Sequence, residues 1–400
     1  MVGSAAPKRV LIGFAESLAA IECAWILVDA GYEVIAFSTD PARAALRRSK
    51  SVEVVAIPDP RVDARASARA IVDLAGRLDA CALLPLDDEA LWLADFAHAE
   101  LSVPVAGPTG EQARLSMDKA QQFELAADAG FNVPATLVFD PSDGLPAQEA
   151  QLPASPHGGL MVKSAFAVAL DGDGLVTGSG YVSHDAGRAI EVLSAAKERV
   201  LVQPRLRGVG EGIFGFADAN GVVAWSGHRR IRMMNPNGSG SSACRSIDPD
   251  PDLIVGAEKF LVAAGWRGIF MLEFLRDAEG CPWFMELNGR PWGSMALARR
   301  RNLAYPAWAV SAAIDPDFVP SAPRSSEHVT ARHLGREILH VAFTVRGRKT
   351  GGPEWPTVRS TLSNVLRWHR GDFWYNARRG ELRVFAVDTM ASVLKPFRRR

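Results

Sequence analysis

The sequence predicts an α/β unit followed by an α+β region, and three observations support this fold class. Apolar runs of strand length alternate with helical runs over roughly the first hundred residues, which is typical of a parallel sheet covered by helices. A break at 104–110, which contains two prolines and two glycines, ends this alternation. Beyond it, short β runs are separated by glycine-rich or helical pieces, which is typical of an α+β arrangement.

The α/β unit is expected to consist of short buried strands with helices between them. Its first strand is the apolar run 8–14, which suits a buried strand better than a secretory signal because Glu16 interrupts it early. No GxGxxG fingerprint of a dinucleotide site accompanies this strand, whose one glycine is Gly13. Further strands are expected at 33–37, 54–57 and 80–84, and helices at 16–30, 63–77 and 87–99.

The α+β region opens with a helix over 118–129, which ends at Gly130. The segment from about 321 onward contains many arginines and has weaker periodicity. Because 400 residues are too many for one ordinary core, two or three domains are expected. Between these ends, β runs are expected at 159–164, 200–204, 212–217 and 221–233, then strands at 269–275 and 282–288 and a helix near 293–301.

The composition is that of a soluble globular protein, with 48% apolar and 22% charged residues. No apolar run approaches the length that spans a bilayer. The four cysteines are scattered without metal-like or disulfide-like spacing, which indicates a reducing compartment. A cytoplasmic location is therefore expected.

The net charge of zero hides an asymmetry along the chain. Residues 324–400 carry 16 Lys and Arg against 6 Asp and Glu, so this segment has a charge of +10 and the rest has −10. Such a segment suggests an acidic partner. The candidates are an anionic membrane surface, a polyphosphate-bearing substrate and another subunit, as in a homodimer. A solvated basic face is an equal alternative. Residues 385–400 pair apolar with basic side chains, so both a membrane-surface anchor and a packed terminal helix stay open.

The two strands at 269–275 and 282–288 carry the strongest candidate site. A turn that contains Gly and Asp separates them, so an antiparallel hairpin is expected, with Glu273 directly opposite Glu286. Opposed side chains in such a pair have Cβ atoms about 5 Å apart, and two carboxylates there repel each other unless a cation lies between them. The alternative is a surface hairpin with solvated acids, which the strongly apolar flanking runs disfavour.

The face of this hairpin predicts the kind of cation. Period-two alternation puts Glu286, Asn288 and Arg290 on one face. Carboxylate and amide oxygens suit Mg²⁺, which proteins usually hold with one or two carboxylates plus substrate phosphates. The sequence therefore predicts a magnesium–phosphate centre with Glu273, Glu286 and Asn288 as metal ligands.

These motifs resemble those of the ATP-grasp superfamily, in particular its carboxylate–amine ligases and its carbamoyl-phosphate-synthase and biotin-carboxylase type. Glu286-x-Asn288-x-Arg290 is similar to the terminal metal motif of that family, and Glu273 is similar to its earlier acidic ligand. The resemblance implies ATP and Mg²⁺ as cofactors, with two ions expected and Mn²⁺ able to substitute.

The resemblance extends upstream to two lysines. Asp118-Lys119 opens a helix as at the start of the family's ATP-binding unit, and Lys163 ends a strand similar to the one that supplies a second phosphate-contacting lysine. The charged ends of lysines are suited to bind phosphate oxygens. The alternative for each of these two residues is an ordinary surface lysine. Residues 164–174 are small and glycine-containing, so a loop there can bring backbone N–H groups against phosphates.

The nucleotide base and ribose are implied to lie further along. Residues 201–206 resemble the family's hinge strand beside adenine, and Pro204 in it has no N–H to donate. The resemblance implies that the ATP-binding residues of this part are Gln203, Leu206 and Glu211.

Arginines near 230 are candidates for the reacting groups. Alternation places Arg230 and Arg232 on one face of their strand, where they are suited to bind a transferring phosphate or a substrate carboxylate. The Gly/Ser-rich run 235–242 is then either a loop that folds over an intermediate or a simple linker. His228 is expected to be a structural hydrogen-bonding residue, since no partner for a general base is evident.

The resemblance covers roughly residues 8–315 and implies a domain organisation. It comprises a Rossmann-like pre-ATP-grasp domain at 1–112, an ATP-grasp domain at 113–320 with a lid at about 130–203 and a metal-binding subdomain at about 204–320, and a basic C-terminal extension at 321–400.

The implied activity is that of an ADP-forming ligase, which joins a small-molecule carboxylate to an amine through an acylphosphate. Arg290, Arg230 and Arg232 are the expected catalytic residues. An ATP-grasp phosphotransferase or carboxylase and a non-catalytic ATP-binding scaffold are the alternatives, and no nucleic-acid partner is expected.

Overall fold

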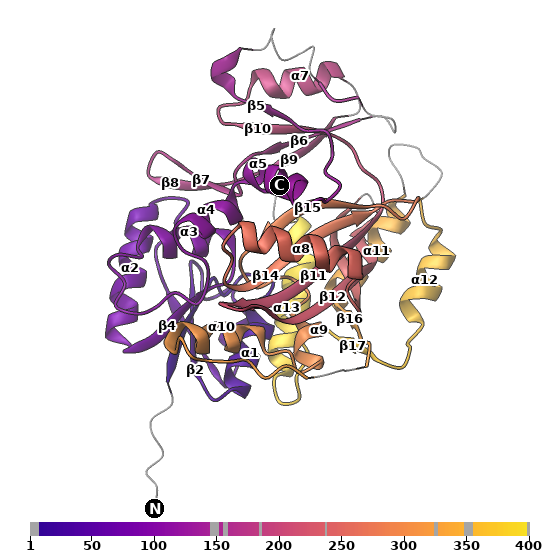
Figure 1. Ribbon diagram of the computed structural model, residues 1–400. Coiled ribbons are helices and arrows are strands. Elements are labelled where there is room, and N and C mark those ends of the chain that lie inside the picture. The colour runs from indigo at the N-terminus through magenta and orange to yellow at the C-terminus, as the bar shows by residue number, and fades with distance from the viewer. Residues whose placement is uncertain are drawn as a thin grey trace, which may run out of the picture.

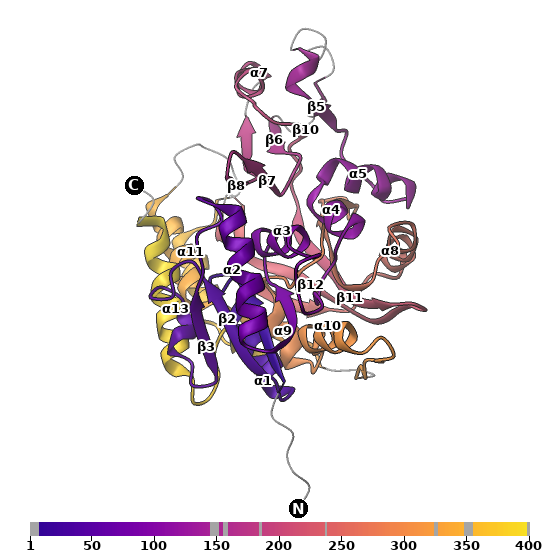
Figure 2. The ribbon, with the colours of Figure 1, turned by 90° about the vertical axis from the view of Figure 1, so that its left-hand side faces the viewer.

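The structure is a computed structural model, and its described residues form sheets of four, four and seven strands and a separate two-stranded hairpin (Figure 1). It describes residues 8–144, 152–154, 159–183, 186–236, 238–323, 327–347 and 355–397. Within these ranges, every helix is too short or too polar to cross a bilayer. Figure 2, turned by 90°, shows the first α/β unit below and the small antiparallel sheet at the top of the molecule.

The first sheet is parallel, as the alternation of runs predicts, with strand order β3-β2-β1-β4. Its strands are β1 (Arg9–Gly13), β2 (Glu33–Ser38), β3 (Val52–Ala56) and β4 (Ala80–Pro85), and its helices are α1 (Ala20–Asp29), α2 (Ala64–Arg77) and α3 (Asp88–Phe96). Val10, Leu11 and Ile12 have no exposed surface, because helices cover both faces of a parallel sheet. Helix α1 begins later than expected, since the amide of Ser17 bonds to the carbonyl of Phe14 in a turn (3.0 Å).

The small sheet is antiparallel, with order β5-β10-β6-β9, and α7 packs against it. Its elements are β5 (Leu137–Phe139), β6 (Leu160–Ser164), β9 (Gly180–Ser183), α7 (Ala186–Ser194) and β10 (Val200–Pro204). Before it come two helices, α4 (Glu111–Met117) and α5 (Lys119–Asp128). The side chain of Asp118 caps α5 by accepting from the amides of Ala120 and Gln121.

The expected loop at 164–174 is in part a hairpin, formed by β7 (Val168–Asp171) and β8 (Gly174–Thr177). This hairpin docks on the first α/β unit, where the amide of Leu175 donates to Pro60 O (2.8 Å). Val168 and Leu175 are buried in the same core cluster as the residues of α2 and α3. Burial of Val168 and Leu175 favours this docked hairpin over an open phosphate-binding loop. The small and glycine-rich composition of the segment did not indicate the docking.

The large sheet has the order β15-β14-β11-β12-β13-β16-β17. Its strands are β11 (Val209–Asp218), β12 (Gly221–Asn235), β13 (Ser239–Ile247), β14 (Gly268–Arg276), β15 (Pro282–Asn288), β16 (Thr330–Arg332) and β17 (Asp372–Trp374). One face packs on α5 and α8 (Pro251–Ala263) through a cluster of phenylalanines. The other packs on α10 (Tyr305–Ile314), and α9 (Met295–Arg300) precedes that helix.

The Gly/Ser-rich run 235–242 is not the flexible loop that its composition suggested. Its second half, 239–242, belongs to β13, which pairs antiparallel with β12, and Asn237 lies outside the described residues. Small side chains do not prevent a backbone ladder when a partner strand lies alongside, so the interpretation as a loop over the site was wrong.

Residues after 321 contribute two strands to the edge of the large sheet, where β16 pairs with β13 and β17 pairs with β16. The helices of this part are α11 (Leu334–Arg346), α12 (Val358–Leu366) and α13 (Leu382–Leu394), drawn in yellow tones in Figure 1. Helix α13 packs against α11 and the short helix η1 (Ala45–Arg48) and buries Val384 completely. The described part of the 385–400 segment is therefore a packed helix, while Arg398–Arg400 lie outside the described residues.

Candidate active site

Two acidic residues of the large sheet form the centre of the candidate site. Glu273 on β14 pairs directly with Glu286 on β15, as the hairpin register predicts, and the register shifts by one residue immediately afterwards. Burial, together with the charge of Glu286, raises the pKa of Glu273, although Arg230 opposes the shift. Arg230 forms an ion pair with Glu273 and so supplies the positive charge that two opposed carboxylates require.

The face predicted from alternation is present. Glu273, Glu286, Asn288 and Arg290 line one pocket, together with Arg230. The side-chain amide of Asn288 donates to Glu286 Oε1 (3.1 Å), which orients both groups. The pocket thus gathers two carboxylates, an amide and two guanidinium groups from strands β12, β14 and β15 and the residues just after β15.

Arg290 is held by a residue that sequence reasoning did not assign to the site. Its Nε and Nη2 donate to the two carboxylate oxygens of Asp88, at 3.0 and 3.1 Å. Although burial opposes it, Asp88 raises the pKa of Arg290, so the guanidinium stays charged. Asp88 begins α3 just beyond the carboxyl end of β4. Open parallel sheets commonly bind ligands at this edge, so the position of Asp88 in the sequence could have indicated a site residue.

Lys163 lies within electrostatic reach of Glu273 and Glu286, and Lys119 lies within reach of Lys163 and Asp88. Burial and the charge of Lys119 lower the pKa of Lys163 to about 8, while Glu286 and Glu273 act in the opposite direction. The Nζ atom of Lys163 lies 4.7 Å from the centre of the Phe123 ring. The amide of Lys119 donates to Ala165 O (2.8 Å), which ties the start of α5 to the segment after β6.

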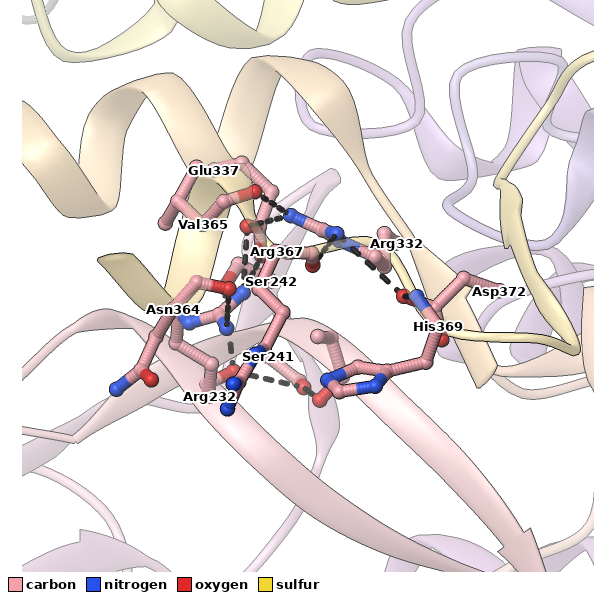
Figure 3. Close-up of polar contacts among 11 residues, drawn as sticks. Arg232, Ser241, Ser242, Arg332, Glu337, Asn364, Val365, Arg367, His369 and Asp372 are labelled. Carbon is pink, nitrogen blue, oxygen red and sulfur yellow. Dashed lines mark hydrogen bonds and ion pairs between the residues drawn. The ribbon is translucent and has the colours of Figure 1, made fainter. Parts of the chain in front are cut away.

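Arg232 is not brought together with Arg230. The β12–β13 pairing shifts register between these two arginines, so simple alternation does not hold there. Arg232 Nη1 donates to Glu337 Oε1 on α11 (2.6 Å), and Nη2 donates to the carbonyl of Asn364 (3.0 Å). Figure 3 shows Arg232 and Arg332 both turned toward Glu337, in a network that joins the C-terminal segment to the large sheet.

The residues expected near the base and ribose lie outside the pocket of Glu273 and Glu286. Gln203 on β10 is 2% exposed, and its Nε2 donates to Thr136 Oγ1 (2.8 Å). Leu206 follows that strand and is partly exposed. Glu211 accepts from Arg229 Nε (2.6 Å) and Arg276 Nε (2.9 Å), so its charge is already paired.

His228 lies in the pocket as a neutral group. Burial and the charge of Arg230 lower its pKa to about 3, and its Nδ1 lies 2.6 Å from Ser294 Oγ. This agrees with the expectation of a structural hydrogen-bonding residue.

The oxygen donors of the pocket fit a magnesium ion that arrives with a nucleotide. Within the described ranges, no group of three or more His, Cys, Asp or Glu side chains is placed to hold a metal ion. Two carboxylates and an amide oxygen match the usual magnesium arrangement, in which substrate phosphates and water complete the coordination.

Comparison with curated proteins finds a partial match. The phosphoribosylamine–glycine ligase of Streptomyces coelicolor is 35% identical over 155 residues, which are 38% of this chain. The chain spans about a third of the length of that enzyme, since the match covers 34% of it. No protein-family model matches the chain.

Solved structures resemble the chain over most of its length. The L-amino acid ligase of Bacillus licheniformis has a TM-score of 0.57 at 15% identity, covering 78% of this chain and 75% of that one. The biotin carboxylase of Campylobacter jejuni, solved as a complex with β,γ-ATP, has a TM-score of 0.60 at 16% identity, covering 81% and 74%. Both neighbours are ATP-grasp enzymes, so the chain has the ATP-grasp fold, and the resemblance indicated by its motifs is confirmed.

Proposed function

We propose that this protein is an ATP-dependent carboxylate–amine ligase that works through an acylphosphate. The observation that carries the proposal is the opposed pair Glu273 and Glu286, which interacts electrostatically with Lys163 and, through it, with Lys119. Two of the similar proteins, the phosphoribosylamine–glycine ligase and the L-amino acid ligase, are ligases by name.

The proposed reaction has two steps. A carboxylate oxygen of the first substrate attacks the γ-phosphorus of ATP, the bond from that phosphorus to the bridging oxygen breaks, and ADP leaves. The amine nitrogen of the second substrate then attacks the acyl carbon, phosphate leaves, and the nitrogen loses a proton. Fixed cations stabilise the charge that develops on the phosphoryl oxygens, and Lys119, Lys163, Arg230 and Arg290 are the groups assigned this role.

In this proposal Glu273, Glu286 and Asn288 hold the Mg²⁺ ions, two of them, with Mn²⁺ as a substitute. Metal ions at such a site neutralise charge on the β- and γ-phosphates. Gln203 and Leu206 contact the base, and Glu211 contacts the ribose. Strand β10, which carries Gln203, pairs with the strand of Lys163, and this supports a nucleotide that extends from one to the other.

The proposal includes the domain organisation. The first parallel sheet acts as a Rossmann-like pre-ATP-grasp domain (1–112), followed by the ATP-grasp domain (113–320) and a basic C-terminal part (321–400). The protein acts in the cytoplasm on small molecules, and its basic segment contacts an anionic substrate, a membrane surface or a second subunit.

A carboxylase or phosphotransferase is a second candidate, and the similarity to biotin carboxylase favours it. In that case bicarbonate or a hydroxyl group takes the place of the substrate carboxylate. Mass spectrometry of the product separates the candidates, since a ligase yields an amide and a phosphotransferase yields a phosphorylated compound. Binding of ATP without turnover by any substrate pair indicates the scaffold alternative.

The proposal is tested with the variant Glu286→Ala, by measuring ADP release over a matrix of carboxylic acids and amines at saturating Mg²⁺. We expect turnover to fall by about 10³-fold or more, because removal of a carboxylate that positions metal and phosphate removes transition-state stabilisation of roughly 4 kcal/mol. Glu279→Ala is the matched control, since this exposed acid lies in the turn of the same hairpin. Near-normal turnover by Glu286→Ala contradicts the assignment.

A further inference from the structure

The pocket of Glu273 and Glu286 has a second wall, which the C-terminal segment supplies. Three of its residues, His333, Arg336 and Tyr375, are named here the C-terminal wall. His333 precedes α11, Arg336 lies in its first turn, and Tyr375 directly follows β17. None of the three belongs to the motifs that predict the metal and phosphate centre.

Arg336 forms no ion pair with an acid among the described residues, and Asp388 acts on its charge only from beyond ion-pair distance. Its Nη1 donates to the carbonyl of Ser241 (3.1 Å), and among the described residues no carboxylate lies within 4.0 Å of it. The other two arginines of the pocket are paired, Arg230 with Glu273 and Arg290 with Asp88. Burial lowers the pKa of Arg336, although Tyr375 and Asp388 act in the opposite direction.

Two polar atoms beside Arg336 in the wall have no hydrogen-bond partner among the described residues. Tyr375 is 5% exposed and His333 is 6% exposed, and no described residue hydrogen-bonds to Tyr375 Oη or to His333 Nδ1. His333 Nε2 lies 3.2 Å from Asp388 Oδ2, so one side of this ring is already engaged. Since buried polar groups are nearly always hydrogen-bonded, the wall calls for a ligand that accepts from a guanidinium and a phenol.

The wall is rigidly built. Glu337, next to Arg336, accepts from both Arg232 and Arg332, and Arg332 Nη1 also donates to the carbonyl of Arg367 (2.9 Å) (Figure 3). The amide of Asn376, next to Tyr375, donates to Glu22 Oε1 in α1 (2.9 Å). Both ends of the wall are therefore held in place before any ligand arrives, which reduces the entropy lost on binding.

We propose that the C-terminal wall binds a substrate carboxylate that is not phosphorylated during the reaction, with Arg336 and Tyr375 Oη as donors. A planar guanidinium matches a carboxylate with two parallel hydrogen bonds. A carboxylate that is not phosphorylated stays ionised, so it can pair with Arg336 during the whole reaction. The reacting carboxylate, in contrast, becomes an acylphosphate. The substrate class is then an amino acid as the amine, or a dicarboxylate as the acyl donor. This inference rests on the proposed ligase function.

The test uses the full-length protein and measures equilibrium binding by calorimetry, so it needs no turnover. The probes are amino acids beside their carboxamides, and short aliphatic dicarboxylates beside their monoamides. We expect wild type to bind the carboxylate member of at least one pair about 10- to 100-fold more tightly, the range for a charge-assisted hydrogen bond. Discrimination among amino acids identifies the amine substrate, and discrimination among dicarboxylates identifies the acyl donor.

Arg336→Leu is expected to abolish this discrimination, and Arg346→Leu, an exposed arginine at the other end of α11, is expected to keep it. Tyr375→Phe and Arg336→Lys disturb the fold less, and each should lose part of the discrimination. The inference is overturned if wild type binds both members of every pair equally, or if Arg336→Leu discriminates like wild type. If Glu286→Ala still turns over ATP while the Arg336 dependence holds, the ligase function fails and the carboxylate site stands.

Discussion

At the scale of single residues, charge pairing divides the basic side chains of the site into two groups. Arg230 and Arg290 are paired with Glu273 and Asp88, so they are held in fixed positions. Lys163 has no such partner in ion-pair contact among the described residues, and its charge depends on the balance between burial and the more distant acids. In the proposed function, the protonation of Lys163 therefore changes the charge that the site offers to the phosphates.

This gives a prediction for pH dependence. Because Lys163 has a pKa of about 8 and must be charged to attract phosphate, kcat/KM for ATP should fall as pH rises through about 8. Below that pH the lysine is protonated and the attraction is complete. Lys163→Arg keeps its charge to far higher pH, so its profile should be flat over the same range. Steady-state kinetics of both proteins test this, and identical profiles would remove Lys163 from the phosphate site.

At the scale of elements, the hairpin β7–β8 links the small sheet to the first α/β unit. The amide of Ala64 donates to Asp173 O (2.7 Å), and the amide of Ala167 donates to Met117 O (2.8 Å). Met117, the acceptor of the second bond, is two residues before Lys119. The docked hairpin therefore also helps to position the start of α5. Docking and phosphate binding are therefore expected to depend on each other.

Gly174 is the position where this docking is most sensitive. A Cβ atom there would lie 2.3 Å from the backbone oxygen of Arg61. A larger residue would therefore force the backbone of one of the two segments to move. Gly174→Val should displace the hairpin, and the amide of Leu175, bonded to Pro60 O, should exchange its hydrogen about tenfold faster or more. Val176→Ala changes an exposed side chain of the same hairpin and should leave exchange unchanged. Equal exchange in Gly174→Val and wild type would show that docking does not limit opening.

At the scale of the whole molecule, the basic C-terminal segment finds part of its counter-charge within the chain. Arg378 Nη2 lies 2.6 Å from Asp29 Oδ1, which is such a counter-charge. Glu337 belongs to the segment itself and pairs with its own Arg332 and with Arg232 of the large sheet. The segment is thereby attached to both the first α/β unit and the large sheet. The asymmetry in charge along the sequence thus reflects, in part, contacts between distant parts of one chain.

Glu337 is the acid on which this attachment depends. Glu337→Gln leaves two largely buried arginines without their shared carboxylate, so the free energy of unfolding should fall by about 3 kcal/mol or more. Urea denaturation followed by tryptophan fluorescence measures the change. Glu327→Gln, an exposed acid of the same segment, should change stability by less than about 0.5 kcal/mol. Equal stability of the two variants would mean that the network contributes no net stabilisation.

The alternating strands of the first sheet and the opposition of Glu273 and Glu286 could both be predicted from the sequence. Both follow from local rules, since burial on both faces produces continuous apolar runs and a turn sets the register of the hairpin that it closes. The same rules failed at Arg232, where a register shift interrupts period two, and at 235–242, where glycine and serine form a strand.

Which arginines form ion pairs depends on contacts between segments that are far apart in the sequence. Arg232 meets Glu337 across 105 positions and Arg290 meets Asp88 across 202, whereas Arg336 forms no ion pair among the described residues. Ion pairing depends on which segments the fold brings within a few ångströms of each other. No local pattern contains that information, so the carboxylate-binding wall could be proposed only after the C-terminal strands were placed on the edge of the large sheet.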